Sequence, residues 1–208
     1  MNQDLGLRER KKLETRRAIA DVAMELFAER GFDAVTVADI AAAANVSTKT
    51  VFNYFATKED IVLLRRELVD EDLLRAIRSR AAGASVLSVV RQHTLETAER
   101  LRNVPPERRA VFRKVLQSAP TVLARFRQMA QSREEALARL LAEETGTDGE
   151  DAEPFVVAAL LGVMNHLAFC GVTGWPGGKR RTPVKIAEEI ERAFALLEHG
   201  LGGYGVKK

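Results

Sequence analysis

The residues from Thr36 to Lys58 constrain the fold of this chain more than any other stretch. They read TVADIAAAANVSTKTVFNYFATK. Thr36 is a good N-cap residue, and Asp39 stands three residues later, where its carboxylate can reach back to the helix start. Asn45 tolerates the left-handed backbone that ends a helix, and Ser47 can cap a second helix. The stretch therefore predicts two short helices joined by a tight turn.

The predicted second helix separates its side chains by chemistry. Val51, Phe52 and Phe55 are expected to lean to one side. The small polar and basic residues are expected on the other side: Thr48, Lys49, Thr50 and Asn53. Such a polar face suits the major groove of DNA, which presents donors, acceptors and thymine methyl groups. The pattern predicts a helix-turn-helix, although an ordinary helical hairpin with a solvated face remains an alternative.

Residues at the edges of this helix are expected to bind the DNA backbone. Ser47, Tyr54 and Lys58 can contact phosphates and so fix the register without reading sequence. The full set of predicted DNA-binding residues is Thr36, Ser47, Thr48, Lys49, Thr50, Asn53, Tyr54 and Lys58.

The segment from Thr15 to Leu64 resembles the DNA-binding domain of the tetracycline-repressor (TetR) family of bacterial regulators. The shared features are, in order, the stripe Ile19, Val22, Ala23, Leu26 and Phe27, then Gly31-Phe32, Thr36 to Ala41, Val46-Ser47, Phe52 to Phe55 and Lys58-Glu59. Two positions depart from the family pattern. Phe52 stands where the family usually has Tyr, and Asn45 replaces the more frequent Gly of the turn.

The resemblance implies a helix-turn-helix DNA-binding domain over residues 1–57 and a helical ligand-binding and dimerisation domain over residues 58–208. It also implies a homodimer formed through the last two helices. Two recognition helices about one DNA turn apart, ~34–36 Å, would read a palindromic operator. A small molecule bound in the second domain would then lower operator affinity by favouring a conformation that does not match the half-sites.

Composition predicts an all-α fold. Hydrophobic residues make up 46%, charged residues 29% and aromatic residues only 6% of 208 residues. These values are typical of a soluble globular protein, and long stretches of Ala, Leu, Arg and Glu favour helices. The net charge of +3 gives weak support for a nucleic-acid partner.

Basic residues cluster near the N-terminus: Arg8, Arg10, Lys11, Lys12, Arg16 and Arg17. They can form a flexible arm that contacts phosphates or enters a minor groove. A frayed and solvated tail is the other interpretation, and the sequence leaves both open.

The predicted compartment is the cytoplasm. The single cysteine, Cys170, excludes an intrachain disulfide, which agrees with a reducing compartment. Met1–Leu7 lacks the apolar core of a signal peptide. No window reaches the ~18 continuous apolar residues of a membrane span, so no membrane partner is predicted.

The helix expected from Ala152 to Val172 leaves almost no polar face. Such a helix must be covered on all sides, so one side is expected in the core and another at a subunit interface. Gly162 would permit close approach of a partner helix. The last helix, expected from Thr182 to Glu198, would complete a four-helix bundle across the two-fold axis.

A small-molecule effector is predicted to contact apolar and polar residues on the inward faces of the second domain. The candidates are His93, Phe112, Phe126, Met129, Met164, Asn165, His166, Phe169 and Trp175. A buried polar group needs a partner, so the histidines can orient a ligand or be satisfied within the core.

Enzymatic chemistry has little support in the sequence. His93, His166 and His199 show no metal-ligand spacing, and no glycine-rich phosphate loop follows a strand. Cys170 lies on an apolar helix without a nearby base. We therefore predict no catalytic residue, no metal and no cofactor. A DNA-binding architectural protein without a ligand is the main alternative to a ligand-released repressor, and a helical enzyme is a third hypothesis.

Overall fold

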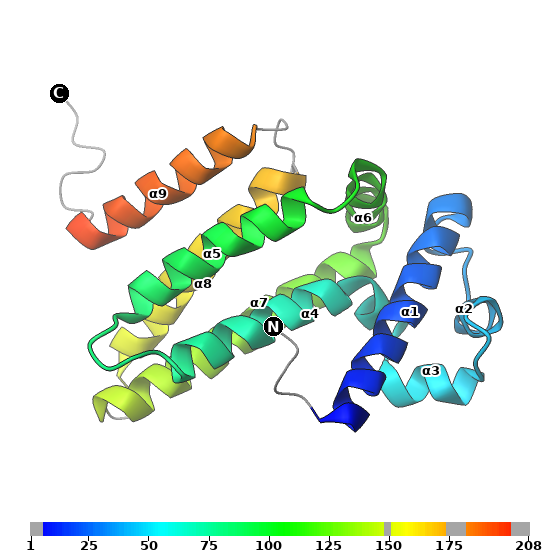
Figure 1. Ribbon diagram of the computed structural model, residues 1–208, viewed down its shortest axis with the longest axis horizontal. Coiled ribbons are helices and arrows are strands. Elements are labelled where there is room, and N and C mark those ends of the chain that lie inside the picture. Colours follow the sequence, from blue (N-terminus) through cyan, green and yellow to red (C-terminus); the bar gives the residue numbers. More distant parts are fainter. Residues whose placement is uncertain (1–5, 148–150, 174–181, 201–208) are drawn as a thin grey trace. The chain divides into compact units, whose positions relative to one another are not determined.

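The computed structural model describes residues 6–147, 151–173 and 182–200, and all regular structure within them is α-helical, as predicted (Figure 1). The helices are α1 (Leu7–Arg30), α2 (Val37–Ala43), α3 (Thr48–Tyr54), α4 (Lys58–Arg78), α5 (Val86–Arg102), α6 (Pro106–Ser118), α7 (Pro120–Thr145), α8 (Ala152–Thr173) and α9 (Pro183–His199).

The chain divides into two compact units. The first consists of residues 1–68 and 106–128, and the second of residues 69–105 and 129–208. Helices α4 and α7 contribute to both units. The functional boundary after residue 57 stays a prediction, because a compact unit of packing is not by itself a unit of function.

Helices α1, α2 and α3 form the start of the first unit (Figure 1). Ile19, Ala23 and Phe27 of α1 are buried, together with Ile40 of α2 and Val51 of α3. Burying a large apolar side chain stabilises by about 1.5–3 kcal/mol, so this small core fixes α3 against α1 and α2.

The turn after α2 has the backbone conformation that the sequence predicted. Asn45 has φ 52°, the left-handed value expected for the end of α2. Gly31 has φ 83° and its N–H donates to the carbonyl of Phe27, which ends α1.

Helix α1 begins at Leu7. The basic residues from Arg8 to Arg17 therefore lie in a helix and not in a flexible arm. Residues 1–5 lie outside the described part of the chain.

The core of the second unit is built from α5, α8 and α9, with parts of α4 and α7 (Figure 1). Its most completely buried side chains include Ile77, Val90, Leu137, Ala158 and Ile190.

Helix α8 carries apolar side chains on both of its sides. Leu161 and Ala168 are buried, whereas Phe155, Val156 and Val163 are 49%, 56% and 56% exposed. By length and composition alone, Ala152–Cys170 could cross a membrane, a test that core helices of soluble proteins also pass. The exposed apolar side agrees with the prediction that a second surface must cover this helix.

The helix that approaches Gly162 closely is α7 of the same chain. A Cβ added there would lie 2.8 Å from Oε1 of Glu134 on α7, within the same chain. The glycine therefore allows close approach of α7 and lies in the interior of the second unit.

Candidate DNA-binding surface

Helix α3 presents a polar surface because apolar residues on its other side are buried in the core of the first unit. Val51 and Phe55 are buried at 1% and 3% exposure. Thr48, Lys49 and Asn53 are exposed. With 3.6 residues per turn, Lys49 and Asn53 stand on the side opposite the buried anchors. This side can enter a groove without moving the core.

Ser47 begins α3 by capping it. Its Oγ accepts the Thr50 N–H at 3.0 Å and lies 2.8 Å from the Thr50 hydroxyl. A cap of this kind contributes about 0.5–2 kcal/mol to helix stability. The Ser47 hydroxyl thus has a structural role besides any DNA contact.

Thr36 has a comparable role at α2. Its hydroxyl accepts the Asp39 N–H at 3.1 Å, and its own N–H donates to Asp39 Oδ2 at 2.8 Å. The reciprocal capping box is the one predicted from the sequence. Hydrogen bonds from Thr36 lower the pKa of the Asp39 carboxyl.

The prediction that Phe52 lies on the same side of the helix as Val51 and Phe55 is wrong. Its side chain is 55% exposed. A seven-residue helix with a narrow anchored side leaves Phe52 at the edge of the outward face. An exposed phenyl ring beside Lys49 and Asn53 can contact a thymine methyl group, which sequence reasoning missed.

The prediction that Lys58 binds a phosphate stays a prediction, and in the DNA-free structure Lys58 has partners within the protein. Its Nζ donates to the carbonyl oxygens of Phe32 at 2.7 Å and Val35 at 2.9 Å. The ammonium also lies 4.1 Å from the centroid of the Phe32 ring. Lys58 therefore ties the start of α4 to the loop before α2, and two of its three donors are already used.

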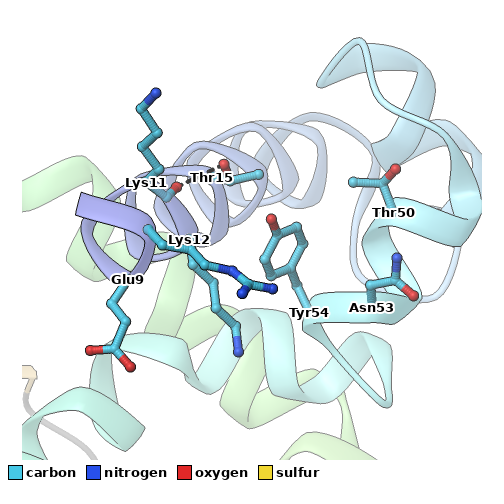
Figure 2. Close-up of a pocket in the computed structure, with 8 residues that line it drawn as sticks. Glu9, Lys11, Lys12, Thr15, Thr50, Asn53 and Tyr54 are labelled. Carbon is cyan, nitrogen blue, oxygen red and sulfur yellow. Dashed lines mark hydrogen bonds between the residues drawn. The ribbon is translucent and has the colours of Figure 1, made fainter. Parts of the chain in front are cut away.

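A hollow lies between the start of α1 and helix α3 (Figure 2). Its volume is about 650 Å³. It is lined by Arg8, Glu9, Lys11, Lys12, Thr15, Thr50, Asn53 and Tyr54. In Figure 2 the ring of Tyr54 stands between α1 and the side chains of Thr50 and Asn53. The hollow is thus continuous with the polar side of α3.

The predicted effector residues are divided between the two units. Phe112 and Phe126 belong to the first unit, where Phe126 is buried 5.9 Å from the Arg66 guanidinium. Trp175 lies outside the described residues. The remaining candidates belong to the second unit: His93, Met129, Met164, Asn165, His166 and Phe169.

His93 of α5 and Asn165 of α8 form a buried polar pair in the second unit. They are 5% and 0% exposed. Among the described residues, neither imidazole nitrogen and neither amide atom of Asn165 has a well-formed hydrogen bond. Burial lowers the pKa of His93, nearby Arg100 lowers it further, and Asn165, Asp72 and Glu96 oppose the shift.

Two other effector candidates lie near this pair along α8. The rings of His166 and Phe169 stack with centroids 5.9 Å apart. Within residues 6–147, 151–173 and 182–200, no three His, Cys, Asp or Glu side chains are grouped to hold a metal ion.

Comparisons with known proteins agree with this architecture. Residues 19–64 match the family model described as "Bacterial regulatory proteins, tetR family". The transcriptional regulator TcmR of Streptomyces glaucescens is 32% identical over 165 residues, which is 76% of this chain and 73% of TcmR. MftR of Mycobacterium tuberculosis, named for transcriptional regulation of mycofactocin biosynthesis, is 31% identical and covers 92% of this chain and 93% of its own.

Solved structures share the fold. A TetR-family regulator from Syntrophomonas wolfei superposes with a TM-score of 0.62 at 19% identity, over 92% of this chain and 98% of that one. NalD, the secondary repressor of the MexAB-OprM multidrug efflux pump in Pseudomonas aeruginosa, superposes with a TM-score of 0.55 at 22% identity, over 89% of this chain and 96% of NalD. The chain therefore belongs to the TetR family of bacterial regulatory proteins, and it is a transcriptional regulator with a helix-turn-helix that binds DNA.

Proposed function

We propose that this protein is a cytoplasmic repressor that binds a palindromic operator as a homodimer and leaves it when a small molecule binds. The observation that carries the proposal is the outward polar side of α3, which Ser47 caps and which Val51 and Phe55 anchor. A rigid helix with this surface can present side chains to base edges.

The proposed contacts divide by the edge of α3 on which they lie. Lys49 and Asn53 read base edges, with Thr48 and Phe52 on one flank. Thr50 and Tyr54 lie on the other flank, toward the hollow, and Tyr54 binds a phosphate. Ser47 and Thr36 stay in the proposal as residues at helix N-termini, where backbone N–H groups also favour phosphates. Lys58 is left out because its ammonium is occupied by two carbonyls.

The homodimer is proposed through α8 and α9. Phe155, Val156, Leu160 and Val163 of α8 and Val184 of α9 are exposed apolar side chains. Large exposed apolar side chains gathered on one side of a helix mark an interaction site. Two copies related by a two-fold axis cover the same surface on each other and set the spacing of the two recognition helices.

Effector binding is proposed at His93 and Asn165. Leaving a buried donor or acceptor unpaired costs about 1–3 kcal/mol, so the pair favours a ligand that supplies the missing hydrogen bonds. A neutral imidazole, which burial favours, can accept one hydrogen bond and donate another. The matching effector carries a polar group, such as a hydroxyl or carbonyl, on an otherwise apolar body.

The DNA contacts are tested with an operator selected from a pool of random duplexes. Thr50→Ala and Tyr54→Ala each weaken binding to that operator by about tenfold, since each loses about one good contact. Thr121→Ala, an exposed site on α7, is the control for a harmless threonine truncation. Unchanged affinity of both variants in a shift assay contradicts the contact assignment.

Effector release is tested separately. A library of small molecules is screened for compounds that raise the melting temperature and free the operator. Compounds that act on the wild-type protein lose both effects on the His93→Leu, Asn165→Leu double variant. If no compound frees the operator, the ligand-independent architectural protein is the better account of the second unit.

A further inference from the structure

The basic cluster of α1 divides into three groups once the helix is formed. Arg8, Lys11 and Lys12 line the hollow beside α3. Arg16 lies elsewhere, where it donates to both carboxylate oxygens of Glu67 at 2.9 and 2.7 Å. It also lies 5.3 Å from the ring of Phe55. Arg16 is therefore part of the packing and not of the hollow.

Arg10 and Arg17 form the third group. Both are exposed, and neither lines the hollow. At 100° per residue they stand on the opposite side of α1 from Arg8 and Lys12. The helix thus carries two sets of solvated cations with the same chemistry but different surroundings.

The start of α1 is a costly place for cations. Helix N-termini carry partial positive charge, so basic residues there are unfavourable by several tenths of a kcal/mol each. Gly6 caps the helix without any side-chain hydrogen bond, and Glu9 is the acidic residue of the first turn. The helix gains from an anion placed beside these cations.

The hollow offers few donors other than the cations. The Thr15 hydroxyl already donates to the Lys11 carbonyl at 2.9 Å. Tyr54 and Asn53, which also belong to the proposed DNA surface, supply the other polar groups. Figure 2 shows Glu9 and Lys11 extending outward, away from Tyr54, so they lie at the rim.

We propose that the sugar-phosphate backbone of operator DNA lies in this hollow, held between the first turns of α1 and Tyr54. The inference rests on the proposed DNA contacts of α3, because Thr50, Asn53 and Tyr54 line the hollow and border the groove-facing side. Arg8 and Lys12 are the principal added contacts. The start of α1 is therefore a second DNA-binding element, which fixes register and adds affinity without reading sequence.

The test compares two double variants with equal loss of charge. Arg8→Gln with Lys12→Gln removes the cations of the hollow, and Arg10→Gln with Arg17→Gln removes those on the opposite side. Operator affinity is measured by fluorescence anisotropy from about 50 to 300 mM salt. We expect the first pair to weaken binding about tenfold near 150 mM and to reduce the salt slope by about two units, since each phosphate contact contributes about 0.9. The second pair changes affinity less than about twofold.

Two further measurements separate a contact from a folding defect. Arg8→Lys with Lys12→Arg keeps both charges and is expected to retain the wild-type salt slope. Hydrogen exchange of residues 7–12 is expected to slow when DNA binds to the wild-type protein and to stay fast in the glutamine pair of the hollow.

The outcomes are distinct. If the two glutamine pairs lose affinity and slope equally, the hollow has no special role and the inference is overturned, while the proposed function stands. A changed base preference in the hollow variant overturns it as well, because it indicates base contacts. Wild-type protein that binds no duplex DNA at low salt overturns both.

Discussion

Helices α3 and α8 expose side chains of opposite character. Helix α3 has seven residues, buries only Val51 among them and turns its polar side chains to solvent. Helix α8 has 22 residues, packs one side in the core and leaves apolar side chains such as Val163 on the other. The short polar surface of α3 and the long apolar surface of α8 therefore suit partners of different chemistry.

The two surfaces are kept in place by different contacts. Helix α3 is too short to be stable alone and depends on its Ser47 cap and on two anchors, Val51 and Phe55. Helix α8 is held along its length by α5 and α9. Changes on α3 should therefore alter DNA binding, whereas changes on the exposed side of α8 should alter assembly.

The largest expected effect comes from a charge placed on the exposed side of α8. Val163→Glu is expected to dissociate the proposed dimer and to lower operator affinity more than about 100-fold, because a buried unpaired carboxylate costs several kcal/mol. Sedimentation and helical content are measured together. Ser132→Glu, on an exposed site of α7, is the control. A Val163→Glu protein that remains dimeric moves the interface elsewhere.

Lys58→Met tests the bonds that tie the start of α4 to the loop before α2. Its loss removes two charge-assisted hydrogen bonds to Phe32 and Val35, so the free energy of unfolding should fall by about 1.5–3 kcal/mol. The salt slope of DNA binding should not change. Urea unfolding measures the loss of stability, and salt titration measures the slope. A slope reduced by about one unit would indicate that Lys58 binds a phosphate.

Phe52→Ala tests the residue that the sequence placed on the wrong side of α3. Wild-type protein should bind about fourfold more weakly when deoxyuridine replaces the contacted thymine, since one methyl group is worth about 0.8 kcal/mol. The alanine variant should no longer distinguish the two duplexes. Phe52→Tyr is the control that keeps the ring, and an alanine variant that still discriminates contradicts the contact.

The acid stability of the second unit should depend on His93. Burial lowers the pKa of His93, so between that lowered pKa and its ordinary value of 6.5 the unfolded chain binds the extra proton. The free energy of unfolding is therefore not reduced by His93 above pH 6.5, and it falls as the pH drops below 6.5. Thermal melts of wild-type and His93→Leu protein from pH 7.5 to 5 are compared. Parallel pH profiles would show that His93 does not carry this effect.

The smallest expected effect concerns Glu9 at the rim of the hollow. Glu9→Gln removes a negative charge that repels phosphate, and affinity for DNA should rise about twofold at low salt. Glu29→Gln, on an exposed site at the far end of α1, should leave affinity unchanged. Equal gains from both substitutions would indicate an effect of net charge alone.

Most of the local structure could be predicted from the sequence. The capping box of Thr36 and Asp39, the cap at Ser47 and the left-handed Asn45 all appear as expected. Each depends on groups at most three residues apart, so the spacing of residue types already specifies the hydrogen bonds. The apolar character of α8 predicted that its core-facing side alone would not cover it, and apolar side chains on its other side are exposed in the single chain.

The tertiary structure decided the matters that depend on neighbours distant in sequence. Lys58 binds carbonyls 26 and 23 residues away, Gly162 approaches Glu134, and His93 meets Asn165. Phe52 could not be assigned because seven residues contain too few apolar positions to define one side. The sequence determined the caps of α2 and α3, because those hydrogen bonds are local. Only packing decided which cation or ring stays exposed, because that depends on what other helices cover.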